Sequence, residues 1–474
     1  MRNSKLYSIL EQFDKYEQNR CRKFLQSPYF NRDEAIVAIF DLLVADINEG
    51  KKKCIEKQYV WEQLDLGEAY DDVRFRKYTS DLTKLIEDFL CQQVYEHNPL
   101  QKANHLIEAV AEKKIEKLYN SSVRLAKRTS EKHPYRSADF YYENYAIENS
   151  YYNLVDYETR RDAKSNHEEI STNLDHFYLA EKLRILCSVL SRHNVASHEY
   201  NILIKDEIVE FVKNNLTHFE NIPPVIVYFQ IYQALINPED ETYYFRLKKL
   251  LDKFALSFPL EEATQIYTYA QNYCVRKINK GNRKFIEELF ELYKLLLEQR
   301  IIIVDDVLSP WYFRNITTVA LRLGEYAWTE QFINDYQQFL PDDFRQNAVT
   351  YNLAQVYFYQ KKYDEVTRLL QEVDFEDYTY NLNSKAMLLA IYYETDEIEP
   401  LYSLFDSFRT YLNRHKDIPL ARRQSFSDLI KFTRKLTRVL PGDKKAVEKI
   451  KTELSTNKNV ASRGWLMEKI AELE

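Results

Sequence analysis

Apolar residues recur along most of this chain at the three- and four-residue spacing of amphipathic α-helices. After Asp71 and Asp72, which suit a helix N-terminus, the pattern predicts a long helix that continues to Leu90. The turn at residues 26–31 ends in Asn31, which we expect to cap the next helix. Two earlier series with the same spacing are Leu6, Ile9, Leu10, Phe13 and Ala35, Ile36, Ile39, Phe40, Leu43. The pattern therefore predicts an N-terminal helical domain over residues 1–100.

Residues 101–310 continue the helical pattern and are interpreted as an array of helical hairpins. The spacing predicts one long helix over residues 103–128. Further along, residues 226–237 are expected to pair with 243–258, and residues 260–278 with 284–299. Residues 301–306 are interpreted as a short apolar connector.

A pattern centred on residues 351–373 recurs 35 residues later and 37 residues earlier. Its positions are Leu353, Ala354, Tyr357, Tyr363, Val366, Leu369 and Leu370. A helix pair that repeats at this period buries its apolar face by stacking on its neighbours. The repeats occupy residues 311–414, and we expect residues 415–474 to form basic C-terminal capping helices.

These residues resemble the tetratricopeptide repeat. Leu353 stands at the Leu of the family's first helix, Ala354 at the small position where two helices touch, and Tyr363 at the start of the second helix. Lys361 replaces the family's turn Gly, which we interpret as a looser or right-handed turn. The resemblance implies an all-α fold, a right-handed helical-repeat solenoid with helical caps at both ends.

In that family the first helices line a concave groove that binds peptides. The corresponding positions are Arg314, Asn315 and Arg322 in one repeat and Asn352, Gln355 and Tyr359 in the next. Arg and amide side chains suit an acidic or C-terminal carboxylate group. The third repeat offers Asn383 and Met387 where a carboxylate clamp has basic residues. The alternative interpretations are therefore a groove filled only by solvent, or a groove filled by the protein's own termini. We expect a non-enzymatic scaffold with a protein or peptide partner.

Only 6 of the 474 residues are Gly, which argues against a β-rich or phosphate-cradling enzyme. No GxSxG, Walker-type or GxGxxG motif occurs, and we expect no cofactor. His193 and His198 are five residues apart, which does not suit a helical metal pair, and no metal site is expected. The acidic pairs at 305–306 and 342–343 are interpreted as helix starts.

A DNA-binding regulator is the alternative function. The order of elements at residues 39–90 resembles the winged-helix domain of response-regulator and antibiotic-regulatory activators. The DNA-contacting residues would be Arg74, Arg76, Lys77 and Lys84. Residues 1–100 hold 15 Lys/Arg against 18 Asp/Glu, and no hairpin wing with a Gly turn follows, which favours a helical cap instead.

The net charge of −7 argues against a general nucleic-acid or anionic-membrane binder. Residues 421–474 differ, with 13 Lys/Arg against 7 Asp/Glu, and could form a basic patch or the wet face of a capping helix. The 5 cysteines form no CxxC pair, the N-terminus lacks a signal-like apolar run, and the apolar runs are too short to span a bilayer. These features predict a cytoplasmic protein, and the Lys-, Tyr-, Asn- and Ile-rich composition favours a bacterial source.

Overall fold

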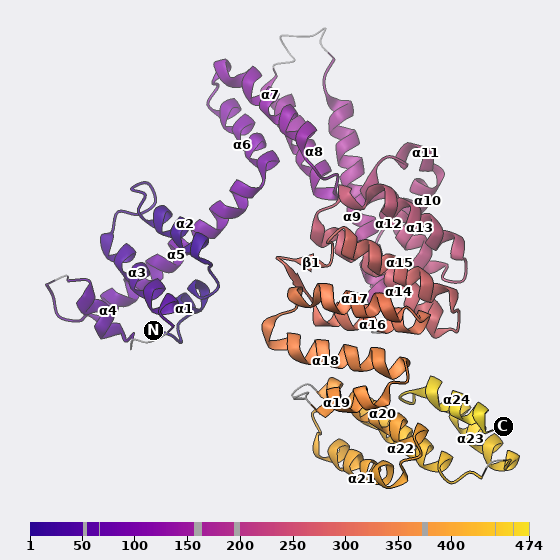
Figure 1. Cartoon of the computed structure of the whole chain (residues 1–474). Helices are drawn as coiled ribbons and strands as arrows, with labels where there is room; N and C mark the ends of the chain where they lie inside the picture. Colours follow the sequence, from indigo (N-terminus) through magenta and orange to yellow (C-terminus); the bar gives the residue numbers. More distant parts are fainter. Residues whose placement is uncertain are drawn as a thin grey trace. The chain divides into compact units, whose positions relative to one another are not determined.

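The computed structural model describes residues 1–50, 55–65, 67–155, 164–193, 200–371, 378–440, 442–457 and 459–473. These residues form 24 α-helices, two short 3₁₀ turns and a single two-stranded hairpin, so the protein is all-α in architecture (Figure 1). Most helices pack against their neighbours in the sequence. The described residues divide into two compact units, one containing Met1–Val189 and the stretch that ends at Phe229, and the other continuing from Gln230.

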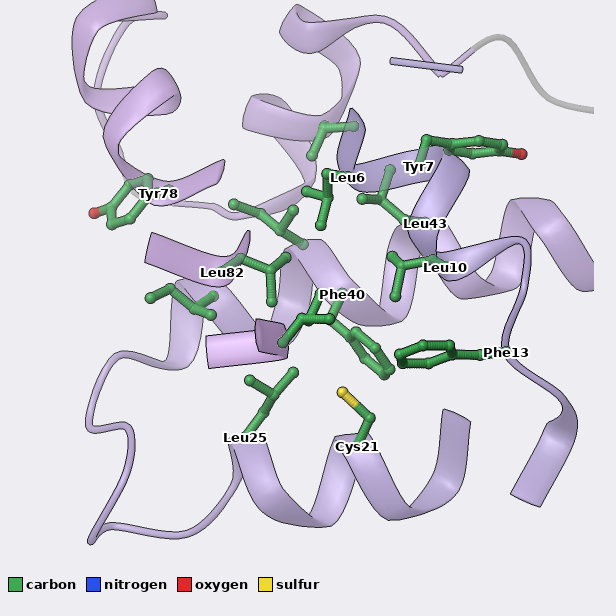
Figure 2. Close-up of a cluster of buried hydrophobic side chains, with 14 of the residues drawn as sticks. Leu6, Tyr7, Leu10, Phe13, Cys21, Leu25, Phe40, Leu43, Tyr78 and Leu82 are labelled. Atoms are coloured by element: carbon green, nitrogen blue, oxygen red, sulfur yellow. The ribbon is translucent and has the colours of Figure 1, made fainter. Parts of the chain in front are cut away.

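The first unit begins with a group of helices that share one hydrophobic core. They are α1 (Lys5–Leu10), α2 (Lys15–Leu25), α3 (Glu34–Asn48), α4 (Lys57–Gln63) and α5 (Asp72–His97). Figure 2 shows side chains of α1, α2, α3 and α5 converging, among them Leu10, Cys21, Phe40 and Leu82. These side chains are almost wholly removed from water, and their burial is the main force that holds the group together.

Capping residues define the ends of these helices. Asp71 accepts hydrogen bonds from the backbone N–H groups of Val73 and Arg74, as the sequence predicts. The prediction for Asn31 is wrong, because Asp33 caps α3 through the N–H of Ala35. Asn31 instead bridges the turn, where its Nδ2 donates to the carbonyl of Leu25 at 2.9 Å.

The first unit continues with α6 (Pro99–Glu112), α7 (Glu116–Lys132), α8 (Ala138–Leu154), α9 (His167–His193), α10 (Lys205–Asn214) and α11 (Leu216–Phe219). The single helix predicted for residues 103–128 is therefore wrong. Lys114 has a φ of +50°, and the N–H of Ile115 bonds the carbonyl of Val110 at 3.0 Å, which ends α6 and reverses the chain. Because α6 and α7 bury a common core, the apolar spacing continues through the turn and hides it.

The remaining elements form helical hairpins in chain order (Figure 1). They are α12 (Pro223–Ile236), α13 (Glu241–Phe254), η1 (Ala255–Ser257), α14 (Leu260–Asn279), α15 (Lys284–Glu298), β1 (Ile303–Val304), β2 (Val307–Leu308), α16 (Pro310–Leu323), α17 (Tyr326–Tyr336), η2 (Gln337–Phe339), α18 (Asp342–Tyr359), α19 (Tyr363–Gln371), α20 (Tyr378–Glu394), α21 (Ile398–Arg414), α22 (Leu420–Leu436), α23 (Lys444–Thr456) and α24 (Arg463–Glu472).

The predicted apolar connector at residues 301–306 contains β1 and leads into a hairpin. Val304 pairs with Val307, and Asp305 and Asp306 form the turn with φ values of +50° and +59°. Two consecutive residues with positive φ are the requirement of a type I′ hairpin turn. The interpretation of this acidic pair as a helix start is therefore wrong, whereas Asp342 and Asp343 do open α18.

Three successive hairpins, α16/α17, α18/α19 and α20/α21, reverse through the same turn. Gly324, Lys361 and Asp396 have φ values of +83°, +58° and +60°, and the following residue donates its N–H to a carbonyl five residues earlier. The predicted looser or right-handed turn at Lys361 is wrong, because Lys361 adopts the left-handed conformation of Gly324. In each hairpin the second helix starts two residues after the residue with positive φ.

The turn geometry predicts opposite responses to substitution. Lys361→Gly should raise the free energy of unfolding by about 1 kcal/mol, because Gly adopts positive φ without the Cβ clash. Gly324→Ala should lower it by about 1 kcal/mol, and this cost is purely conformational because a Cβ there would meet no atom within 4 Å. Urea unfolding followed by circular dichroism measures both effects.

Gly464→Ala is the matched control, because Gly464 lies in α24 without a positive φ and also has open space around its Cα. This variant should gain stability through the higher helix propensity of Ala. A loss of stability at Gly464 similar to that at Gly324 would contradict the assignment of strain to the turn.

Candidate functional site

The first helices of the three hairpins bring four polar side chains together. We call this set, Arg314 of α16, Tyr351 and Gln355 of α18, and Asn383 of α20, the first-helix strip. Gln355 Nε2 donates to the hydroxyl of Tyr351 at 3.0 Å. Burial raises the pKa of Tyr351, while the positive charge of Arg314 and a hydrogen bond with Asn383 oppose that rise. Tyr351 is therefore the point at which all three helices meet.

A second contact lies at the other end of the same helices. Tyr359 of α18 is 42% exposed, and Arg322 of α16 is also exposed. Partial burial raises the pKa of Tyr359, and the positive charge of Arg322 counteracts this effect, which shows that the two groups are near each other. Arg322 and Tyr359 thus form a pair that solvent or a ligand can reach.

The two predicted asparagines are not in the strip. Asn352 is fully buried, and its Nδ2 donates to the carbonyl of Ala348 at 2.7 Å within its own helix. Asn315 of α16 is directed to α15, where it forms a hydrogen bond with the hydroxyl of Tyr293. The structure instead adds Tyr351, which the repeat pattern did not single out, and Asn383, which that pattern places at a clamp position without a basic residue.

Arg314 and Arg322 have no carboxylate partner among the described residues. Ion pairs hold several other arginines, among them Arg20, Arg22, Arg74, Arg300, Arg345 and Arg368. A guanidinium group presents N–H donors in a fork that matches a carboxylate. The two unpaired arginines, with the amides of Gln355 and Asn383, therefore form a surface suited to an anionic group.

The C-terminal helix covers the corresponding position of the third hairpin. Tyr359 follows Arg322 by 37 residues, and Glu394 of α20 follows Tyr359 by 35 residues. Glu394 forms an ion pair with Lys469 of α24 at 3.2 Å, accepts a hydrogen bond from the indole N–H of Trp465 at 2.8 Å, and bonds the hydroxyl of Tyr363. The Lys469 and Glu394 side chains are only 5% and 13% exposed. Leu466 and Ile470 are buried beside this pair and anchor α24.

Two of the four residues that would contact DNA in the alternative function form ion pairs within the chain. Arg74 pairs with Glu68 and also donates to the hydroxyl of Tyr78 at 3.1 Å, and Arg76 pairs with Asp72 at 2.5 Å. Lys77 is exposed, while Lys84 lines a pocket whose other side chains include Asp33 and Asp81. Within the described part of residues 1–100 no strand occurs, so no wing accompanies α5 there.

Several basic side chains of the C-terminal segment make contacts within the chain. Lys435 pairs with Glu453, Arg423 donates to the carbonyl of Ile418 at 3.0 Å, and the Arg434 guanidinium lies over the ring of Tyr402 at 5.5 Å. These contacts attach α22 to its neighbours and reduce the number of free cations on its surface.

The described histidines and cysteines lie outside the first-helix strip. The described residues contain no group of three or more His, Cys, Asp or Glu side chains arranged to hold a metal ion, and His198 lies outside them. Burial raises the pKa of Cys21 and of Cys274 to about 12, so neither is a thiolate at neutral pH. Among the helices described, none is long and apolar enough to cross a lipid bilayer.

Comparison of the chain with protein-family models, curated proteins and solved structures gave no match.

Removal of Lys469 should be costly, because it leaves Glu394 buried without a counter-charge. We expect Lys469→Met to lower the free energy of unfolding by about 3 kcal/mol and to accelerate hydrogen exchange in α24. Lys469→Met combined with Glu394→Gln should recover part of the loss. Lys445→Met on the exposed face of α23 is the control and should change stability little. Equal stability of Lys469→Met and Lys445→Met would refute the role of the ion pair.

The same pair predicts a window of pH stability. Burial alone would raise the pKa of Glu394, but hydrogen bonds from Tyr363 and Trp465 and the charge of Lys469 bring that pKa below 4.5. The contribution of Glu394 to the free energy of unfolding is therefore present above pH 4.5 and is lost as pH falls through the folded-state pKa. Burial alone would lower the pKa of Lys469, but Glu472 and Glu394 raise it above 10.5, so its contribution is lost as pH rises through the raised value. The difference in unfolding free energy between wild type and the double variant should shrink at both extremes.

Proposed function

We propose that this chain is a non-enzymatic protein-interaction scaffold that binds an acidic segment of a partner through the first-helix strip. The fold we propose for it is a right-handed, tetratricopeptide-repeat-like solenoid capped at both ends. The matching turns at Gly324, Lys361 and Asp396 support this fold, because equal turns at nearly equal intervals repeat the same hairpin. The buried contacts of α24 with Glu394 support the C-terminal cap.

The observation that carries the proposal is the pair of arginines without carboxylate partners. Arg314 and Arg322 both belong to α16, and their positive charges act on Tyr351 and Tyr359 of α18. A carboxylate bound there would gain charge-assisted hydrogen bonds to the guanidinium groups and neutral ones to Gln355 and Asn383. Because α24 covers the third hairpin, an acidic stretch or a chain terminus suits the strip better than a long helix does.

The proposal is tested by Arg314→Glu combined with Arg322→Glu in the full-length protein. Tagged wild type and variant are compared by capture from native lysate with quantitative mass spectrometry, followed by direct titration of the captured partner. We expect the affinity to fall at least about tenfold, since a lost charge-assisted bond costs roughly 1.5–3 kcal/mol. Arg314→Lys should lose less, because it keeps the charge but not the fork.

Arg409→Glu provides a control with the same charge change, because Arg409 is exposed on α21, a second helix. This variant should capture the same partners as wild type. Undiminished capture by the Arg314→Glu/Arg322→Glu variant would show that the strip is not the binding surface. Asn352 is unsuitable for this test, because its substitution would disturb the interior of α18.

A further inference from the structure

The hairpin of α6 and α7 contains an apolar pocket that is separate from the first-helix strip. It lies between the two helices beside the end of α5 and has a volume of about 490 Å³. Its lining is mostly apolar and includes Tyr95, Ala103, Leu106, Ala109, Leu125 and Thr129. The pocket is large enough to accept apolar side chains of another molecule.

The helix α7 leaves two leucines uncovered, while Tyr119, Val123 and Ala126 pack toward the core. Only Ser122 and Ala126 of α7 are buried, whereas Leu118 and Leu125 are 42% and 48% exposed. These two leucines are seven residues apart and therefore lie on one face of the helix. Leu106 of α6, at 38% exposed, extends the apolar surface into the pocket. Leu106 and Leu125 line the same pocket, and exposed apolar side chains gathered at one place can mark an interaction site.

The pocket lies in a basic environment within an acidic chain. Residues 99–132 hold 8 Lys/Arg against 4 Asp/Glu, whereas the whole chain has a net charge of −7. Lys102, Arg128 and Lys132 are exposed and have no carboxylate partner among the described residues. Of the acidic residues, Glu108 already accepts contacts from His105 at 2.8 Å and Asn104 at 3.0 Å. Residues 99–132 therefore carry a net positive charge, and three of their exposed cations are not paired with a carboxylate among the described residues.

We propose that the α6–α7 pocket binds an acidic amphipathic helix of a partner protein. Apolar side chains at one face of that helix would enter the pocket over Leu106 and Leu125, and flanking carboxylates would meet Lys102, Arg128 and Lys132. Nucleic acid suits the pocket less well, because its floor is aliphatic. The one aromatic ring there, Tyr95, is already stacked on His105, with ring centroids 5.9 Å apart.

The test is a selection of displayed peptides on immobilised full-length protein. The library fixes apolar residues at helical spacing over about 18 residues and draws the other positions from Asp, Glu, Lys and Gln. We expect the selection to enrich acidic sequences. Leu125→Glu should weaken the selected peptide at least about tenfold, and Arg128→Glu with Lys132→Glu should weaken it and reduce its dependence on salt.

Leu256→Glu is the matched control, because Leu256 is 72% exposed in η1 and distant in sequence from this hairpin. It should leave peptide binding unchanged, and Leu125→Glu should melt like wild type because Leu125 is half exposed. The proposal is overturned by absent enrichment, by enrichment of basic peptides, or by equal binding to Leu125→Glu. Dimerisation of the chain through Leu125 would also overturn the proposal. So would binding of a single-stranded oligonucleotide that is lost in Leu125→Glu.

The strip and the pocket can fail independently. Arg314→Glu with Arg322→Glu should leave the selected peptide bound, because those arginines belong to the second unit and the pocket to the first. Loss of the peptide in that variant would overturn the assignment to the α6–α7 pocket.

Discussion

One backbone hydrogen bond closes the reversal in each of the three hairpins α16/α17, α18/α19 and α20/α21. A residue with positive φ ends the first helix, and the next residue donates its N–H to a carbonyl five residues earlier, as Glu325, Lys362 and Glu397 do. This bond satisfies an otherwise free carbonyl and directs the second helix back along the first. Only then can Ala354 and Val366, both fully buried, share one core. The strip depends on this return, because it spaces the first helices closely enough for Arg314 to act on Tyr351.

The helical class and several helix ends could be predicted from the sequence, because apolar spacing and capping residues are local signals. Asp71 caps α5 in this way. The break within residues 103–128 could not be predicted, because Lys114 has no special preference for positive φ and the packing of both helices compensates for the strain. The turn at Asp305 and Asp306 could not be predicted either, because adjacent acids suit both a helix start and a hairpin turn, and the pairing of Val304 with Val307 decides between them.

The site could be predicted less fully, since its geometry depends on the rotation of each helix. Arg314 and Gln355 contribute to the strip, but Asn352 lies one position from Tyr351 and therefore points about 100° away from it around α18. A polar residue at that position suggests exposure, yet the amide of Asn352 is partly satisfied by the carbonyl of Ala348. The role of Asn383 also depends on packing, because it reaches Tyr351 from the next hairpin.

Buried charges of this chain have partners within the chain, whereas the arginines of the proposed binding surface have no carboxylate partner among the described residues. Where a charge is buried, as at Glu394, it is matched by Lys469 and two further donors, since an unmatched buried charge would be costly. Arg314 is half-buried and Arg322 exposed, so water can hydrate them when no ligand is bound. A carboxylate that replaces this water gains attraction in a partly desolvated setting, where Coulomb energy is larger than in bulk solvent. The third hairpin has the opposite polarity, because its first helix supplies the carboxylate of Glu394 and α24 supplies the cation of Lys469.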